Sequence, residues 1–290
     1  MASIDPNLRI RAVELAVSDL SRSVEFYERV LGLPLLAREE HTALLGPDRE
    51  HPALVLGDIA APTPLPPAAA GLYHVAWLHP SRAALAETAR RVAAARWPLE
   101  GAADHGVSEA LYLSDPDGLG IELYADRPRE QWRRGPGGDG VAMVTLALDF
   151  DDLLAQFSGT PAAALPAQTT VGHVHLKVAD VARAVAFYRD ALGMDVQAVL
   201  PSAAFLSAGG YHHHVGLNSW QSAGAALAPD SAPGLRRVEL ELSDAAALDA
   251  LERGLADRPS PPAFERGGTG ELALRDPDGE LLVFTAAPGR

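Results

Sequence analysis

Two short stretches of this 290-residue chain hold side chains that can bind a metal ion or move a proton. The stretch LYLSDPDGLGIELYAD, residues 111–126, places the carboxylate of Glu122 between Ile121 and Leu123 in an otherwise apolar strand. The stretch GGYHHHVGLNSW, residues 209–220, carries three consecutive histidines. Carboxylates and imidazoles are common ligands of divalent metals, and imidazole exchanges protons near neutral pH. Both stretches are therefore candidate parts of a reactive site.

The elements that must position these side chains belong to a tandem repeat. The segment VSDLSRSVEFYERVLGLPL, residues 17–35, matches VADVARAVAFYRDALGMDV, residues 178–196. The Asp-Pro-Asp-Gly turn at 115–118 recurs at 276–279. Both matches have the same offset of 161 residues, since 178 − 17 and 276 − 115 are equal. A constant register over so long a stretch indicates that one half of the chain is a duplicate of the other.

Each half divides again into two modules with the order strand, helix and three strands. In the first module RAVELAV alternates with period two, Asp19 caps a helix with apolar residues at helical spacing, and Gly32 ends that helix. The pattern predicts an α+β fold of four βαβββ modules in two tandem halves. The predicted boundaries are 1–126 for the N-terminal half (modules 9–60 and 71–126), 127–169 for a connection, and 170–290 for the C-terminal half (modules 170–222 and 235–287).

Composition narrows the class of protein. Lys and Arg number 24 and Asp and Glu 38, and the difference of −14 argues against nucleic acid or an anionic membrane surface as a partner. No apolar run approaches the roughly 18 residues of a membrane-spanning helix, and the first residues lack the pattern of a signal peptide. There is no cysteine, which excludes disulfides and thiolate metal sites. We therefore expect a cytoplasmic protein.

The four modules resemble the vicinal oxygen chelate superfamily, which includes glyoxalases, fosfomycin-resistance enzymes and extradiol ring-cleaving dioxygenases. The resemblance implies that modules pair into cupped mixed sheets and that metal ligands come from the first and last strands of the paired modules. The first-strand ligand is typically a histidine seven residues before the residue that opens the helix. His74 and His173 fit this spacing, whereas Ala12 and Arg237 occupy the position in the first and fourth modules.

The last-strand ligand position holds Glu122 in the second module and Val283 in the fourth. The resemblance thus implies a metal site of His74, Glu122 and His173, with His175 as the substitute if His173 is not a ligand. These ligands can meet only if module two pairs with module three, so we expect the metal cup there and a vacant cup between modules one and four. Two imidazoles and one carboxylate are typical of non-haem Fe(II) oxygenases, and Mn(II) accepts the same set.

The segment DHGVSEALYLSDPDGLGIE is similar to the signature of extradiol dioxygenases, in which a histidine and a tyrosine hydrogen-bond the substrate oxygens. The matching residues here are His105 and Tyr112. These enzymes also carry a His-His pair whose second member is the acid–base catalyst. Strand alternation places His212 and His214 on one face and His213 on the other. The resemblance then implies His214 as the catalyst, with His212 as the alternative.

These features imply an Fe(II)-dependent extradiol dioxygenase that inserts O2 into a catechol, a small aromatic diol, without an organic cofactor. A related enzyme that cleaves a hydroquinone is one alternative. A glyoxalase-like metal isomerase is another, although residues 212–220 lack the acid that would supply its fourth ligand. A non-catalytic small-molecule-binding protein of this fold is the third, and the retained triad counts against it. The sequence is also compatible with a homo-oligomer, because strand edges in such sheets often pair.

Overall fold

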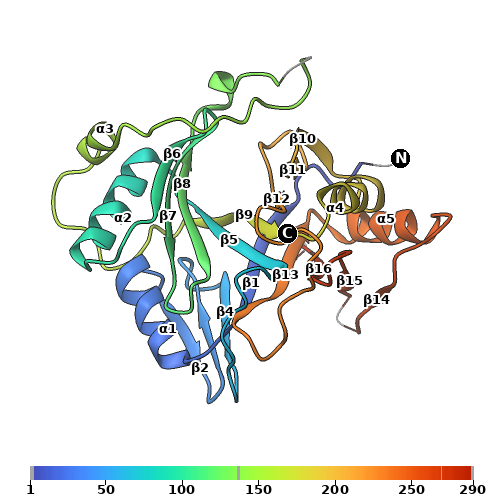
Figure 1. Cartoon of the computed structure of the whole chain (residues 1–290), viewed down its shortest axis with the longest axis horizontal. Coiled ribbons are helices and arrows are strands. Elements are labelled where there is room, and N and C mark those ends of the chain that lie inside the picture. The colour runs from blue at the N-terminus through green and yellow to red at the C-terminus, as the bar shows by residue number, and fades with distance from the viewer. Residues whose placement is uncertain (1–2, 136–137, 269, 289–290) are drawn as a thin grey trace.

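The computed structural model describes residues 3–135, 138–268 and 270–288, and its elements follow the predicted order in all four modules (Figure 1). The first module consists of β1 (Arg9–Val17), α1 (Leu20–Phe26), the π-helical turn η1 (Tyr27–Leu31), β2 (Leu35–Arg38), β3 (Thr42–Leu45) and β4 (Leu54–Asp58). The second consists of β5 (Gly71–Leu78), α2 (Arg82–Ala94), β6 (Gly101–Asp104), β7 (Ser108–Ser114) and β8 (Gly120–Asp126).

In its described residues the connection carries the short helices η2 (Arg129–Gln131) and α3 (Phe150–Ala155). The third module consists of β9 (Thr170–Lys177), α4 (Val181–Ala186), the π-helical turn η4 (Phe187–Ala191), β10 (Asp195–Leu200), β11 (Ala203–Ser207) and β12 (Val215–Asn218). The fourth consists of β13 (Gly234–Leu242), α5 (Ala245–Ala256), β14 (Phe264–Arg266), β15 (Leu272–Arg275) and β16 (Leu281–Ala286). Within these described ranges, no helix has both the length and the apolar character needed to cross a membrane.

The modules form two eight-stranded sheets, and each sheet combines one module from each half. One sheet has the order β10-β11-β12-β9-β5-β8-β7-β6, in which antiparallel β5 and β9 join module two to module three. The other has the order β14-β15-β16-β13-β1-β4-β3-β2, in which β1 and β13 join module one to module four. In Figure 1, α1 and α2 flank the strands on the left, and α4 and α5 flank them on the right. The predicted α+β fold of paired βαβββ modules is confirmed.

The four main helices begin where the sequence supplies an N-cap. Asp19, Ser81, Asp180 and Asp244 each have extended backbone and accept a hydrogen bond from the backbone N–H three residues later. Such a cap satisfies one of the backbone donors that a helix start leaves unpaired. The π-helical turn η1, which continues α1, ends at Gly32, whose φ of 78° lies in the left-handed region that favours glycine. The cap residue therefore marks where each helix begins, shortly after the opening strand of its module.

The repeated Asp-Pro-Asp-Gly turn fastens the two modules of each half to one another. The hydroxyl of Tyr27, in the π-helical turn η1, donates to Oδ2 of Asp115 at 3.2 Å, and Tyr188 donates to Asp276 at 3.1 Å in the second half. Oδ1 of Asp115 accepts the backbone N–H of Leu119 at 2.9 Å, which closes the turn. Burial raises the pKa of Asp115 to about 6, although these hydrogen bonds oppose that rise. The Asp-Pro-Asp-Gly turn that marks the duplication therefore stabilises the contact between the two modules of each half.

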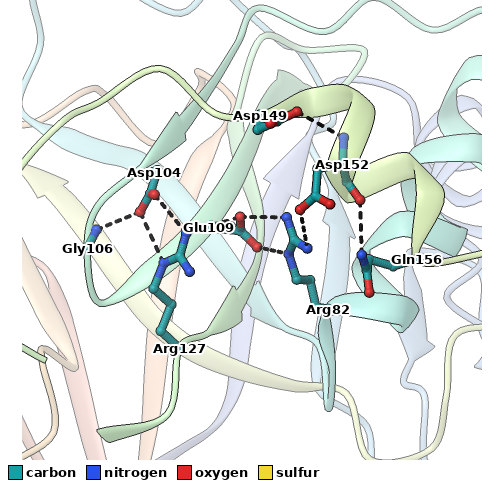
Figure 2. Close-up of polar contacts among 8 residues, drawn as sticks. All are labelled: Arg82, Asp104, Gly106, Glu109, Arg127, Asp149, Asp152 and Gln156. Atoms are coloured by element: carbon teal, nitrogen blue, oxygen red, sulfur yellow. Dashed lines mark hydrogen bonds and ion pairs between the residues drawn. The ribbon is translucent and has the colours of Figure 1, made fainter. Parts of the chain in front are cut away.

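A network of charged side chains ties the connection between the halves to module two (Figure 2). Glu109, on β7, is buried and accepts from Arg82 at 3.0 Å and from Arg127 at 3.2 Å. Arg82 also pairs with Asp152 of α3 at 2.7 Å, and Arg127 pairs with Asp104 at 2.7 Å. Figure 2 shows Glu109 between the two arginines, so one carboxylate holds both the start of α2 and the residue that follows β8.

Glu109→Gln is expected to lower the free energy of unfolding by about 1–2 kcal/mol, measured by urea denaturation. The substitution removes the negative charge between two guanidinium groups, and hydrogen bonds to charged groups contribute about 1.5–3 kcal/mol. The loss stays below the several kcal/mol of a fully buried pair because both arginine side chains are 31% exposed and solvent screens their charge. Asp152→Asn is the control, with an expected loss under about 1 kcal/mol, because its side chain is 56% exposed. Equal losses in the two variants would contradict a central role for Glu109.

Candidate metal centre

Three adjacent strands at the middle of one sheet bring His74, Glu122 and His173 together. Ala76 of β5 lies opposite Glu122 of β8 on one side and opposite His173 of β9 on the other. His74 lies two residues before Ala76, so its side chain projects from the same face of the sheet. Oε2 of Glu122 is 2.9 Å from Nε2 of His74 and 3.1 Å from Nε2 of His173. The two imidazole nitrogens are 3.4 Å apart.

This cluster has the donor set of a metal site. One ligand atom from each of the three residues lies within 4.8 Å of the others, and all three side chains are buried. Burial alone would raise the pKa of Glu122, but the neighbouring His173 and His74 outweigh it and leave that pKa well below its usual range. Burial lowers the pKa of His173 to about 4, against the opposing effect of Glu122. An ionised carboxylate beside a neutral imidazole is the form in which these side chains bind a divalent ion.

His175 lies on the same strand face as His173 and adjoins the cluster. It is paired in register with His74, and the two rings are 5.0 Å apart. A side chain at position 216 would collide with its ring, since a Cβ there would lie 2.8 Å from Cγ of His175, so Gly216 provides its space. Burial, and next His74, lower the pKa of His175 well below its usual value. His175 therefore lines the cluster as a neutral imidazole.

His105 and Tyr112 lie together beside the cluster. The Tyr112 hydroxyl is 2.6 Å from Nε2 of His105, and the Tyr112 ring lies 5.8 Å from the ring of His74. Burial, followed by the charge of Glu122, raises the pKa of Tyr112. Nδ1 of His105 is 2.7 Å from the carbonyl oxygen of Val144, in the connection, and it donates to that oxygen because a carbonyl only accepts. The connection thereby fixes which nitrogen of His105 faces Tyr112.

The three consecutive histidines do not follow the strand alternation that pointed to His214. Strand β12 begins only at Val215, and the histidines lie in the bend before it. His213 is the one beside the cluster, with its ring 4.0 Å from the ring of His173. Burial, and next the neighbouring His173, lower the pKa of His213 well below its usual value. The predicted orientation of His213, toward the opposite face, is wrong.

His214 faces a different part of the molecule. Its Nδ1 accepts the backbone N–H of Ala208 at 3.1 Å, and its ring lies 5.0 Å from that of Tyr211. Burial, followed by His212, lowers its pKa to about 3. The side chain helps line a separate cavity of about 210 Å³, and none of the three clustered residues is among the described residues around it. The geometry therefore contradicts the strand register from which His214 was selected as the acid–base residue.

A group of hydrogen-bonded side chains beside the cluster was missed by the sequence analysis. The hydroxyls of Tyr124 and Tyr211 are 2.7 Å apart, and Tyr211 also donates to Asp126 at 3.3 Å. Gly172 admits the Tyr124 hydroxyl, because a Cβ at that position would lie only 1.8 Å from it. Glu122, Tyr124 and Asp126 are alternate residues of β8, and alternate residues of a strand share one face of the sheet. This spacing could have indicated that Tyr124 and Asp126 lie on the same face as Glu122.

The other sheet lacks an equivalent cluster among its described residues. Ala12 and Val283 stand at two of the corresponding ligand positions. At a third, Arg237 pairs with Glu239 at 3.4 Å, and its other carboxylate neighbour, Glu271, is 3.9 Å away. The positive charge of Arg237 is unsuited to holding a cation. Among the residues that the structure describes, one of the two sheets therefore presents a metal donor set at its centre.

Comparisons with known proteins agree with this architecture. The family described as the Glyoxalase/Bleomycin resistance protein/Dioxygenase superfamily matches residues 9–123 and 170–284, and the chain belongs to it. The chain is 42% identical over 258 residues to the catechol-2,3-dioxygenase of Bacillus subtilis (strain 168). The aligned region covers 87% of this chain and 88% of that protein. This relative supports an oxygenase role for the chain.

Solved structures of low sequence identity share the fold. One, from Bacillus subtilis subsp. subtilis str. 168, is 14% identical and has a TM-score of 0.63, covering 99% of this chain and 87% of that chain. Glyoxalase I from Zea mays is 17% identical and has a TM-score of 0.57, covering 96% of this chain and 92% of that chain. At these identities the likeness concerns the fold alone.

Proposed function

We propose that the protein is an Fe(II)-dependent extradiol dioxygenase that opens the ring of a catecholic substrate beside its two hydroxyls. The observation that carries the proposal is the buried cluster of His74, Glu122 and His173 at the centre of one sheet. The 42% identity to a catechol-2,3-dioxygenase supports the same reaction class. His74, Glu122 and His173 would hold the ion, and Mn(II) is the other metal suited to this donor set.

When bound, such an ion supplies positive charge that favours an anionic diol and open positions for the diol and O2. The residues of the chain would bind and orient the substrate. The paired His105 and Tyr112 offer hydrogen-bonding groups for the diol oxygens, and a fixed orientation lowers the entropic part of the barrier. His213, whose ring lies 4.0 Å from that of His173, would accept a proton from a diol hydroxyl and return it later, and His214, beside a separate cavity, would not. Burial of the cluster excludes bulk water from these exchanges.

The proposal is tested by anaerobic reconstitution with Fe(II), addition of catechol, and admission of O2. The expected result is uptake of one O2 per catechol together with the yellow absorbance of a ring-opened semialdehyde. A parallel reconstitution with Mn(II) decides between the two metals. A protein that holds stoichiometric iron but consumes no O2 with catechol contradicts the proposal. O2 uptake with a hydroquinone alone would favour the alternative ring-cleaving reaction, and conversion of a glutathione hemithioacetal without O2 would favour the isomerase.

A further inference from the structure

Asp126, His212 and His213 form a continuous series of hydrogen bonds that ends beside the cluster. Oδ1 of Asp126 is 2.9 Å from Nε2 of His212. Nδ1 of His212 is 2.7 Å from Nδ1 of His213, whose ring lies 4.0 Å from that of His173. Asp126 belongs to module two and the histidines to module three, so the series crosses from one module of the cup to the other.

The chemistry of these groups fixes the protons along the series. An ionised carboxylate only accepts hydrogen bonds, so Nε2 of His212 carries the hydrogen between the two residues. When His212 is in its neutral form it has one N–H, and its Nδ1 then accepts. Nδ1 of His213 is consequently the donor, and its Nε2 is left with a free lone pair. Among the described residues, Nε2 of His213 has no hydrogen-bond partner, so it is the ring nitrogen available to a substrate hydroxyl.

We propose that Asp126 and His212 are positioning residues that hold His213 in the tautomer with an unprotonated Nε2. This inference rests on the proposed function, in which His213 takes a proton from a diol hydroxyl. A hydroxyl can give a proton only to a nitrogen with a free lone pair, and the opposite tautomer would present an N–H instead. The carboxylate of Asp126 thus acts on the reaction through His212, without contact with the substrate.

The packing around His212 supports this role, because the ring has no freedom to turn. His212 is fully buried, with its ring centroid 4.1 Å from that of Tyr211 and 5.3 Å from that of Trp132. Asp126 is held in turn by the Tyr211 hydroxyl at 3.3 Å. Burying an imidazole is costly unless its polar atoms are paired, and both nitrogens of His212 have partners.

The first test is ¹⁵N NMR of the metal-free protein labelled at its histidines, with His213→Gln used to identify the signals of His213. We expect the protonated-Nδ1 signature for His213 in the wild type. In Asp126→Asn the amide N–H can donate to Nε2 of His212, so the series can reverse and His213 gains the protonated-Nε2 signature. Tyr211→Phe is the matched control, since it removes the other hydrogen bond of Asp126 and leaves the series intact. A wild-type His213 protonated at Nε2, or an unchanged tautomer in Asp126→Asn, overturns the inference.

The second test compares turnover of catechol by the iron-loaded variants. We expect kcat of Asp126→Asn to fall roughly 10²–10⁴-fold, the usual value of a correctly protonated base, with KM and iron content near the wild type. Asp126→Glu keeps the carboxylate, so its kcat should lie between those of Asp126→Asn and the wild type. A changed tautomer with unchanged kcat would overturn the positioning role. If the wild-type protein itself does not cleave catechol, the proposed function fails, and NMR alone then decides on the hydrogen-bond series.

Discussion

Alanine in place of His74, Glu122 or His173 is expected to abolish stoichiometric iron binding and, with it, turnover of catechol. Each substitution removes one of three donor atoms, and Glu122→Ala also removes the negative charge that balances the ion. Changes to residues that merely support ligands already weaken metal binding about 10–100-fold, so loss of a ligand itself should exceed that range. The measurement is the iron content after anaerobic reconstitution and desalting, followed by O2 uptake with catechol.

The corresponding positions of the other sheet provide the controls. Val283→Ala and Arg237→Gln should leave both iron content and turnover near the wild type, because these side chains lie in the cup that lacks a donor set. Stoichiometric iron in His74→Ala would show that the ligand assignment is wrong. Iron retained in His173→Ala alone would instead point to His175, whose ring lies 5.0 Å from that of His74.

His213→Ala is expected to retain iron and catechol binding and to lose roughly 10²–10⁴-fold in turnover, the usual contribution of a positioned acid–base group. The ring of His213 lies beside His173 but makes no hydrogen bond to the clustered side chains, so its removal spares the donor atoms. Iron content, the catechol dissociation constant under anaerobic conditions and kcat should be measured on the same preparation.

His214→Ala is the matched control for that substitution. It removes the same imidazole one position further along the chain, and its ring faces a separate cavity. Turnover close to the wild type is expected. Collapse of kcat in His214→Ala, with near-normal kcat in His213→Ala, would restore the assignment that strand alternation first favoured.

The fold and the members of the cluster could be predicted because both depend on regular spacing. An N-cap fixes where each helix begins. Strand positions that lie the same number of residues before the cap are therefore equivalent in all four modules. The resemblance to the vicinal oxygen chelate superfamily implied that the ligand stands seven residues before that cap, and this position holds His74 and His173. Glu122 stood out because the duplicate of its strand carries Val283, and only the pairing of module two with module three allows the three side chains to meet.

The histidine run could not be placed by the same reasoning. Alternation of side chains holds only where a strand is paired in a sheet, and the sequence does not reveal that β12 begins at Val215. The partnership of Asp126 with His212 joins residues 86 positions apart in the chain. Such a contact depends on the three-dimensional placement of a bend, for which the sequence holds no periodic signal.

The crossed pairing of modules also governs the order in which the protein can be built during synthesis. β1 and β5 pair with β13 and β9, so after the first half leaves the ribosome each still lacks one of its two neighbours in the final sheet, although β4 and β8 are already present. Unpaired strand edges of this kind are prone to aggregate, and domains are generally made from the N-terminus onward. His74 would lie on such an open edge of β5, with Glu122 on the adjacent strand β8, until His173 arrives on β9. The nascent first half is therefore the stage at which open strand edges are exposed to other chains.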